Sequence, residues 1–199
     1  MTITANQVSE LRARTGAGMM DCKKALSETG GDIDAAIEHL RKTGIAKAEK
    51  KSDREASEGL VHSYIHPGGR VGVLIQVNCE TDFVAKTEDF QSLVRDLAMQ
   101  VAATSPRGVR REDIDETIVA KEREVFAAQM ADQKKPAEVM ERIISGKIDK
   151  FYAETVLLEM PFIKDDSKTV DTLVKEISGK LGENIVVRRF ARFALGEGS

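Results

Sequence analysis

Apolar residues recur along the chain with two different periods, and the shorter period predicts strands. Between residues 70 and 78 a branched apolar residue stands at every second position, which predicts a half-buried strand. Residues 60–66 alternate in the same way, and Pro67-Gly68-Gly69 between the two stretches is typical of a turn. Residues 185–195 also have strand character. These patterns predict a hairpin and a third strand.

The longer period, 3.6 residues, predicts helices. The clearest case is residues 87–103, where seven apolar residues form one stripe: Phe90, Leu93, Val94, Leu97, Ala98, Val101 and Ala102. Further helices are predicted over residues 112–131, after Pro136, and over residues 169–181, while residues 156–163 are expected to be extended.

The first 44 residues predict three short helices. Thr4 and Gln7 form a capping box at the start of the first helix, and residues 15–18 end it. The second helix is expected over residues 19–28, before Gly30-Gly31. Asp32 caps the third helix, which is expected to end at Gly44. A module of this size has a small core, which is more typical of a docking domain than of an enzyme.

These elements predict an α+β fold with two domains. Residues 1–54 would be the three-helix docking module and its linker. Residues 46–55 are charged and nearly devoid of apolar periodicity, which is typical of a linker with some helical character. Residues 55–199 would be an α+β core, in which helices pack on a small three-stranded antiparallel sheet. Such a sheet has two exposed edges, and both faces of residues 185–195 carry apolar side chains, so self-association is expected.

Composition narrows the classes of function. The 199 residues are 41% apolar and 32% charged, with a net charge of −3, 5% aromatic residues and no Trp. This balance argues against a nucleic-acid surface, which usually combines basic stripes with stacking aromatic residues. No apolar run approaches the roughly 20 residues of a membrane span. Residues 1–4 lack the features of a signal peptide, and we expect a cytoplasmic protein.

Motifs for catalysis and cofactor binding are absent from the sequence. It contains no Walker A loop, no G-x-G-x-x-G after a strand, no H-E-x-x-H and no G-x-S-x-G. Cys79 with His62 or His66 would be needed for a thiol enzyme, but a buried, reduced cysteine is the more common role. Glu80 and Asp82 on one turn are more typical of a solvated cap than of a metal site. We therefore expect no metal, no cofactor and no bond-making chemistry.

The junction between the strand and the helix at residues 77–86 is the most unusual stretch. It places the large apolar side chain of Phe83 on a short turn, so the ring must enter either the protein's own core or a partner. The apolar stripe that begins at Phe90 supplies a sufficient core without it. We therefore expect Phe83 to face a partner.

Two stretches resemble the signatures of a known family. Residues 11–26 read LRARTGAGMMDCKKAL and residues 77–86 read VNCETDFVAK, and both resemble signatures of bacterial elongation factor Ts. The resemblance continues through residues 160–163 and 167–170 into the last strand, and so covers essentially the whole chain. Two long signatures in the right order are highly specific.

The resemblance implies a guanine-nucleotide exchange factor for elongation factor Tu in its GDP-bound state. In this family a three-helix, ubiquitin-associated-like module docks on the partner's nucleotide domain. A Thr-Asp-Phe-Val turn then enters near the partner's magnesium site, so that Mg²⁺ and GDP leave. By motif match the entering residues are Thr81, Asp82, Phe83 and Val84. The other partner-binding residues implied are Arg12, Met19, Met20, His66, Phe162 and Ile163.

The chain differs from the longer members of the family. Those members carry two related core subdomains, an inserted coiled coil and a C-terminal helical extension, whereas this sequence shows one strand-strand-helix unit and no long heptad pattern. The resemblance is therefore to the short form, which implies a homodimer.

Several alternatives stay open on the residues alone. An adapter that binds through the three helices without affecting nucleotide release is the second candidate function.

Adjacent Met19 and Met20 cannot both face a narrow core, and we expect Met19 to be mostly buried and Met20 exposed. Lys23-Lys24 is expected to be a solvated face, and Arg188, Arg189 and Arg192 a solvated or dimer-facing set.

Overall fold

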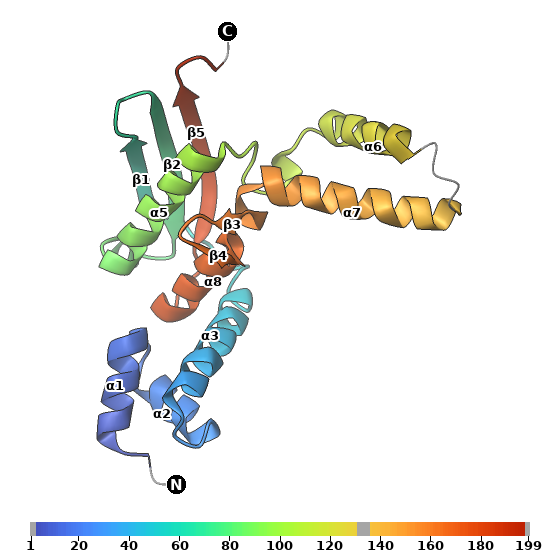
Figure 1. The fold of residues 1–199 in the computed structure, drawn as a ribbon. Helices are drawn as coiled ribbons and strands as arrows, with labels where there is room; N and C mark the ends of the chain where they lie inside the picture. Colours follow the sequence, from blue (N-terminus) through green and yellow to red (C-terminus); the bar gives the residue numbers. More distant parts are fainter. Residues whose placement is uncertain (1–2, 131–135, 198–199) are drawn as a thin grey trace. The chain divides into compact units, whose positions relative to one another are not determined.

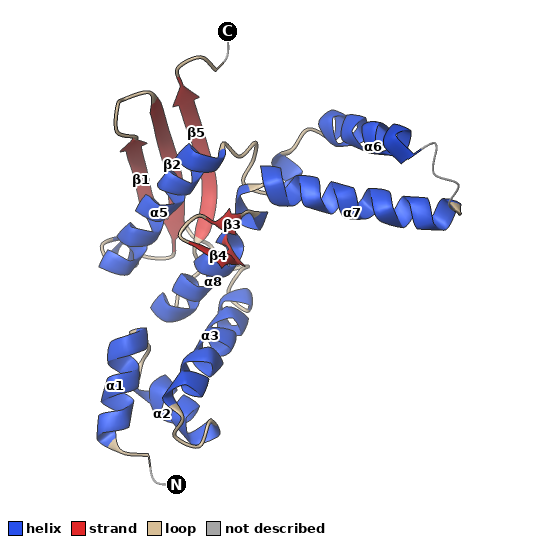
Figure 2. Cartoon of the chain, in the orientation of Figure 1, coloured by secondary structure: helices blue, strands red, loops and turns tan. Residues whose placement is uncertain are grey.

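The computed structural model describes residues 3–130 and 136–197, and it confirms the predicted α+β class. Figure 2 shows the helices and strands along this part of the chain. The longer helices are α1 (Ala5–Thr15), α2 (Met19–Glu28), α3 (Ile33–Glu49), α5 (Glu88–Thr104), α6 (Glu116–Met130), α7 (Ala137–Thr155) and α8 (Val170–Leu181). The strands are β1 (Glu58–Ile65), β2 (Val71–Cys79), β3 (Pro161–Phe162), β4 (Asp165–Thr169) and β5 (Val186–Ala194). The short turns of helix are α4 (Asp82–Ala85), η1 (Arg111–Asp113) and η2 (Leu157–Glu159).

The contacts between residues divide the chain into two compact units. The first unit contains residues 1–60, 78–93 and 172–186, and the second contains residues 61–77, 94–171 and 187–199. The first unit thus combines the N-terminal helices with the 79–86 turn and α8. The second unit contains most of the sheet and helices α6 and α7.

The three N-terminal helices form a small bundle with the expected boundaries at most ends. The Thr4–Gln7 capping box begins α1, and Gly16, with φ 67°, ends it in the left-handed conformation. The Asp32 side chain accepts the Ala35 N–H and caps α3. The bundle buries six side chains in one cluster: Val8, Leu11, Cys22, Ala25, Leu26 and Ala36.

Helix α3 does not end at Gly44, and this prediction is wrong. The helix continues to Glu49 and so includes part of the stretch expected to be a linker. Gly44 is a packing residue, because α8 crosses α3 at Gly179. A Cβ on Gly179 would lie 2.4 Å from the Gly44 carbonyl oxygen, so only glycine permits this backbone approach. A helical glycine serves here for close packing and not as a stop signal.

The sheet of the second unit has the order β1-β2-β5 (Figure 1). His66 N–H donates to the Val71 carbonyl and closes the β1–β2 hairpin. Leu195 N–H donates to the Arg70 carbonyl, while Arg189 bonds to Gln76, so β5 runs antiparallel to β2. On β2 the alternating residues Val73, Ile75 and Val77 are buried, and the whole predicted α5 stripe is buried as well. The period-two and period-3.6 predictions are thus confirmed.

The opposite face of this sheet carries exposed apolar side chains. They are Val61 and Ile65 of β1, Leu74 of β2, Phe193 of β5, and Leu195, which directly follows β5. We call these residues the open sheet face. Arg192 does not join a solvated arginine set, since its guanidinium donates to the Ala102 carbonyl of α5 at 3.3 Å and pairs with Glu197.

Helices α6 and α7 pack against each other as a hairpin, which the lack of a long heptad pattern did not predict (Figure 1). Their shared core is Met130, Ile144 and Ile148, with further apolar residues around it. The expected helix over 112–131 begins later, because η1 occupies residues 111–113 and Asp115 caps the helix through the Thr117 N–H. Ala131, its expected end, lies outside the described residues.

The segment after α7 is less extended than expected. Residues 157–159 form η2, and β3 pairs with β4 in a second, two-stranded antiparallel sheet that the patterns did not predict. The Gln100 side chain bridges to this segment: it donates to the Pro161 carbonyl at 3.0 Å and accepts the Ile163 N–H at 2.8 Å. The buried amide of Gln100 thereby fixes β3 against α5.

Candidate functional site

The 79–86 turn presents Phe83 to solvent. Thr81 caps the single helical turn α4 by accepting the Val84 N–H, and only Ala85 of that turn is buried. Phe83 is 77% exposed, whereas Phe90, on the stripe of α5, is fully buried. A Phe in this position leaves a large apolar surface uncovered. The turn therefore offers an aromatic ring on a short, capped support.

The backbone below this ring is held by several side chains of the first unit. The Cys79 thiol donates to the Thr81 carbonyl at 3.1 Å. The Glu183 carboxylate accepts three hydrogen bonds: from the Glu80 N–H at 3.1 Å, the Thr81 N–H at 3.0 Å and the Thr81 hydroxyl at 2.6 Å. Hydrogen bonds to an ionised acceptor are stronger than neutral ones. The backbone that leads into Phe83 is thus held both by the Cys79 thiol and by the Glu183 carboxylate.

Asp82 is paired within the turn itself. Lys86 Nζ lies 2.6 Å from an Asp82 carboxylate oxygen, and the same ammonium lies 6.0 Å from the centre of the Phe83 ring. The hydrogen bond from Lys86 is the main cause that lowers the pKa of Asp82 below its usual range. Asp82 is therefore a carboxylate at neutral pH, and it flanks the exposed ring with a negative charge.

The predicted docking residues of the N-terminal bundle lie on its surface. Arg12 on α1 is exposed. Met20 is 74% exposed and Met19 is 51% exposed, so the expectation that Met19 is mostly buried is wrong. Met19 is the first residue of α2, beyond the part of the helix that packs through Cys22 and Leu26. Both methionines therefore present flexible apolar side chains to solvent.

The remaining predicted residues belong to the second unit. His66 is exposed at the start of the hairpin turn, and its Nδ1 lies 3.1 Å from the Tyr64 hydroxyl oxygen. Phe162 is only 5% exposed, whereas Ile163 is 42% exposed. Phe162 thus belongs to the protein's own core, and Ile163 is the accessible member of this pair.

The Cys79 thiol is poorly suited to nucleophilic catalysis. Its side chain is buried, and burial is the main cause that raises its pKa to about 11, with a further contribution from the charge of Glu183. A thiol with this pKa is almost entirely protonated at neutral pH. Cys79 therefore acts as a hydrogen-bond donor inside the turn.

The comparisons with known proteins agree with one another. A sequence profile described as "Elongation factor TS" matches residues 4–197. An elongation factor Ts of Moorella thermoacetica is 61% identical over 196 residues, which cover 98% of this chain and 97% of the relative. The elongation factor Ts of Geotalea uraniireducens is 57% identical, and the match covers 100% of this chain and 92% of the relative. The chain belongs to the elongation factor Ts family.

Membership of the elongation factor Ts family makes the chain a translation elongation factor. The coverage of the Moorella relative, 97% of its length, agrees with the short form of elongation factor Ts. Among residues 3–130 and 136–197, no group of three or more His, Cys, Asp or Glu side chains is arranged to hold a metal ion. No helix in this described part is long and apolar enough to cross a membrane.

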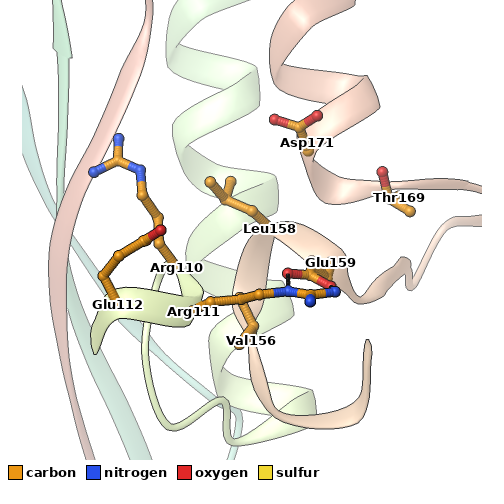
Figure 3. A pocket seen from close by; sticks show the side chains of 8 residues that line it. All are labelled: Arg110, Arg111, Glu112, Val156, Leu158, Glu159, Thr169 and Asp171. Atoms are coloured by element: carbon orange, nitrogen blue, oxygen red, sulfur yellow. Dashed lines mark hydrogen bonds and ion pairs between the residues drawn. The ribbon is translucent and has the colours of Figure 1, made fainter. Parts of the chain in front are cut away.

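A pocket in the second unit is lined by eight residues, five of them charged: Arg110, Arg111, Glu112, Glu159 and Asp171. Figure 3 shows Arg111 beside Glu159. The Arg111 guanidinium donates to both oxygens of the Glu159 carboxylate, at 2.6 and 2.7 Å. Arg111 also bonds to Asp149 at 3.1 Å, and its guanidinium lies 4.3 Å from the Tyr152 ring centre. The hydrogen bonds to Glu159 and Asp149 and the charges of these two carboxylates raise the pKa of Arg111 above its usual range. Arg111 therefore anchors the base of the α6–α7 hairpin.

Glu183 is the site residue that the elongation factor Ts signatures did not reveal. It lies 102 positions after Thr81, so no local spacing connects the two. The available signal was Gly182, which ends α8 and exposes the next residue to a neighbouring element. Only the folded chain brings the carboxylate to the turn.

Proposed function

We propose that the protein is a guanine-nucleotide exchange factor for elongation factor Tu in its GDP-bound state. The three-helix module, residues 1–54, docks on the nucleotide domain of the partner. The turn Thr81–Val84 then enters beside the partner's magnesium site, Mg²⁺ and GDP leave, and GTP rebinds. Such a factor acts in the cytoplasm, where translation takes place. It makes and breaks no covalent bond.

The exposure of Phe83 on a firmly held turn carries this proposal. Burial of a Phe side chain in a partner pocket contributes about 1.5–3 kcal/mol. Each ~1.4 kcal/mol of preference for the partner state that holds GDP poorly lowers nucleotide affinity about tenfold. A ring that is already ordered before binding loses little conformational entropy on entry, so more of this energy is available to release GDP. Asp82 adds a negative charge beside the ring.

The other contacts divide between docking and support. Arg12, Met19 and Met20 lie exposed on the N-terminal bundle and suit a surface that mixes charge with adaptable apolar contacts. His66 at the hairpin turn and Ile163 after β3 are proposed as further contacts. Phe162 takes part indirectly, because its buried side chain supports the backbone that presents Ile163.

We further propose that two copies of the chain associate as a homodimer through the open sheet face. Val61, Ile65, Leu74, Phe193 and Leu195 are all exposed on one side of a three-stranded sheet. Exposed apolar patches of this kind mark interaction surfaces. A second identical face covers the patch and supplies the other half of the core.

Release of fluorescent GDP from elongation factor Tu tests the exchange function. The wild-type protein should accelerate release, and Asp82→Ala/Phe83→Ala should lose most of this acceleration. A matched control is Glu124→Ala/Val125→Ala, which removes an exposed acid and an exposed apolar neighbour from α6. The control should behave as wild type. If Asp82→Ala/Phe83→Ala accelerates release as well as wild type, the proposed entry of the Thr81–Val84 turn is wrong.

A binding measurement separates exchange from the adapter function. An adapter that uses only the three-helix module binds elongation factor Tu but leaves the rate of GDP release unchanged. Wild-type protein that binds without accelerating release therefore favours the adapter.

The variant Cys79→Ser tests whether the protein is a thiol enzyme. A thiol enzyme would lose its activity, whereas an exchange factor should keep most of its exchange activity.

A further inference from the structure

Residues 182–184 contact two segments of the first unit that are far apart in the sequence, residues 51–54 and residues 80–81. The Glu183 carboxylate accepts the three hydrogen bonds from Glu80 and Thr81 described above. In return, the Glu80 carboxylate accepts the Asn184 N–H at 2.7 Å. The two segments therefore exchange hydrogen bonds in both directions. A reciprocal arrangement resists displacement of either segment more than one contact does.

The same three residues hold the chain that follows α3. The Asn184 side-chain amide donates to the Ser52 carbonyl at 3.0 Å and to the Arg54 carbonyl at 2.7 Å. Lys51 Nζ donates to the Gly182 carbonyl. Residues 182–184 thus contact both the chain that follows α3, at residues 51–54, and the 79–86 turn, which we call the Phe83 turn.

The position and direction of the Phe83 ring depend on how the short helix α4 is held. Only Ala85 of α4 is buried, so apolar packing contributes little to the orientation of this helical turn. The Glu80 and Thr81 amides and the Thr81 hydroxyl direct the chain into α4, and all three donate to a single carboxylate. Loss of that acceptor leaves the start of α4 without its main polar support, and Phe83 must then be ordered when it binds.

We propose that Glu183 is the positioning residue of the Phe83 turn: it fixes residues 80–81 before the partner binds, so that Phe83 enters without a further ordering step. The expected effect of Glu183 on GDP release rests on the proposed exchange function. The hold on the turn is a property of the free protein. Glu183 acts on the turn through Glu80 and Thr81.

Glu183→Ala and Glu183→Gln test this role. Glu183→Ala removes all three acceptor interactions, and the maximal rate of stimulated GDP release should fall about tenfold, while the concentration for half-maximal stimulation changes much less. Glu183→Gln retains one oxygen for the backbone amides and should recover part of the rate. The control is Glu176→Ala, which removes a carboxylate of α8 that pairs with Arg41.

Amide hydrogen exchange of Glu80 and Thr81 in the free protein gives a readout that does not depend on the partner. Both amides should exchange faster in Glu183→Ala, and less so in Glu183→Gln, than in wild type and Glu176→Ala. Unchanged amide exchange overturns the inference. Wild-type release rates in Glu183→Ala also overturn it, while the exchange function itself stands.

Two further outcomes remain decisive. If Glu183→Ala does not fold, Glu183→Gln is judged by the same two measurements, and wild-type behaviour in both overturns the inference. If the wild-type protein does not stimulate GDP release, the proposed function fails by itself. The amide exchange of Glu80 and Thr81 then decides whether Glu183 holds the turn.

Discussion

Phe83 and Phe90 belong to the same stretch of sequence but lie in opposite environments. Phe90 falls on the 3.6-residue stripe of α5 and is fully buried, while Phe83 lies on a capped helical turn that buries only Ala85. Residue type does not distinguish them, because both are large and apolar. The periodic position within the helix decides which ring enters the core.

Cys79 provides a prediction at the scale of one residue. At pH 8 a pKa near 11, in place of the ordinary 9.0, lowers the thiolate fraction about a hundredfold. Alkylation of Cys79 in the folded protein should therefore be slow, as measured by mass spectrometry of the labelled peptide. The same peptide in the denatured chain is the control. Equal rates in the two states would contradict the raised pKa.

The raised pKa of Cys79 also predicts a dependence of stability on pH. The folded state keeps the thiol protonated up to a pKa of about 11, whereas the unfolded chain loses this proton near its ordinary value of 9.0. The contribution to stability is therefore fully present below pH 9 and is lost as the pH rises from 9 to about 11. The free energy of unfolding of Cys79→Ala, measured by thermal unfolding, should therefore decrease less than that of wild type between pH 9 and about 11.

At the scale of elements, the crossing of α3 and α8 depends on two glycines. Gly44 and Gly179 allow the two backbones to approach each other, and α3 continues through Gly44 instead of ending there. Beyond the crossing, Lys175 pairs with Glu49 at 3.3 Å. This crossing joins the N-terminal bundle to the helix that leads into Glu183. Its stability therefore bears on the support of the Phe83 turn.

A single methyl group tests this crossing. Gly179→Ala places a Cβ 2.4 Å from the Gly44 carbonyl oxygen and should lower the free energy of unfolding by about 1–3 kcal/mol through overpacking. The control is Gly146→Ala on α7, where nothing in the described part of the chain outside the helix's own backbone and Gly146's two neighbours lies within 4 Å of the added Cβ. That change should raise stability by about 0.5–1 kcal/mol, because Ala favours the helix. Thermal unfolding measures both, and a Gly179→Ala protein as stable as wild type would rule out the tight crossing.

At the scale of the whole molecule, the surface carries one extended apolar region in the described part of the second unit, the open sheet face. A single sheet covered on one side by α5 leaves the other side to solvent or to another chain. The five side chains of this face come from all three strands and the residue that follows β5, and they follow the period of two that the sequence displays. The proposed homodimer covers this region.

A charge on the open sheet face tests the dimer. Sedimentation of the wild-type protein at micromolar concentration should give a mass near twice the chain mass of 21.9 kDa. Phe193→Asp should shift the mass toward that of one chain, because a buried unpaired carboxylate disfavours the interface. Val139→Asp, at an exposed apolar position on α7, is the control and should leave the mass unchanged. A wild-type mass of one chain would contradict the dimer.

Most elements of the fold were predictable from the sequence, since their causes lie within a few residues. The capping box at Thr4, the αL stop at Gly16 and the stripe of α5 depend only on neighbours along the chain. The helical hairpin α6–α7 and the small β3–β4 sheet were missed. Helices α6 and α7 were each predicted, but their pairing is set by tertiary contacts. Strands β3 and β4, of 2 and 5 residues, are too short to show a period.

Within the candidate site, exposure of the Phe83 ring was predictable from the sequence, because the apolar stripe that begins at Phe90 supplies a sufficient core without it. The sequence by itself also determined the family, through two long signatures. The tertiary structure alone decided that Met19 faces solvent, that Phe162 is buried and that Gly44 is a packing residue. It also placed the Glu183 carboxylate beneath the Phe83 turn. Each of these depends on residues distant in sequence, whose approach is set by packing and long-range hydrogen bonds and not by local pattern.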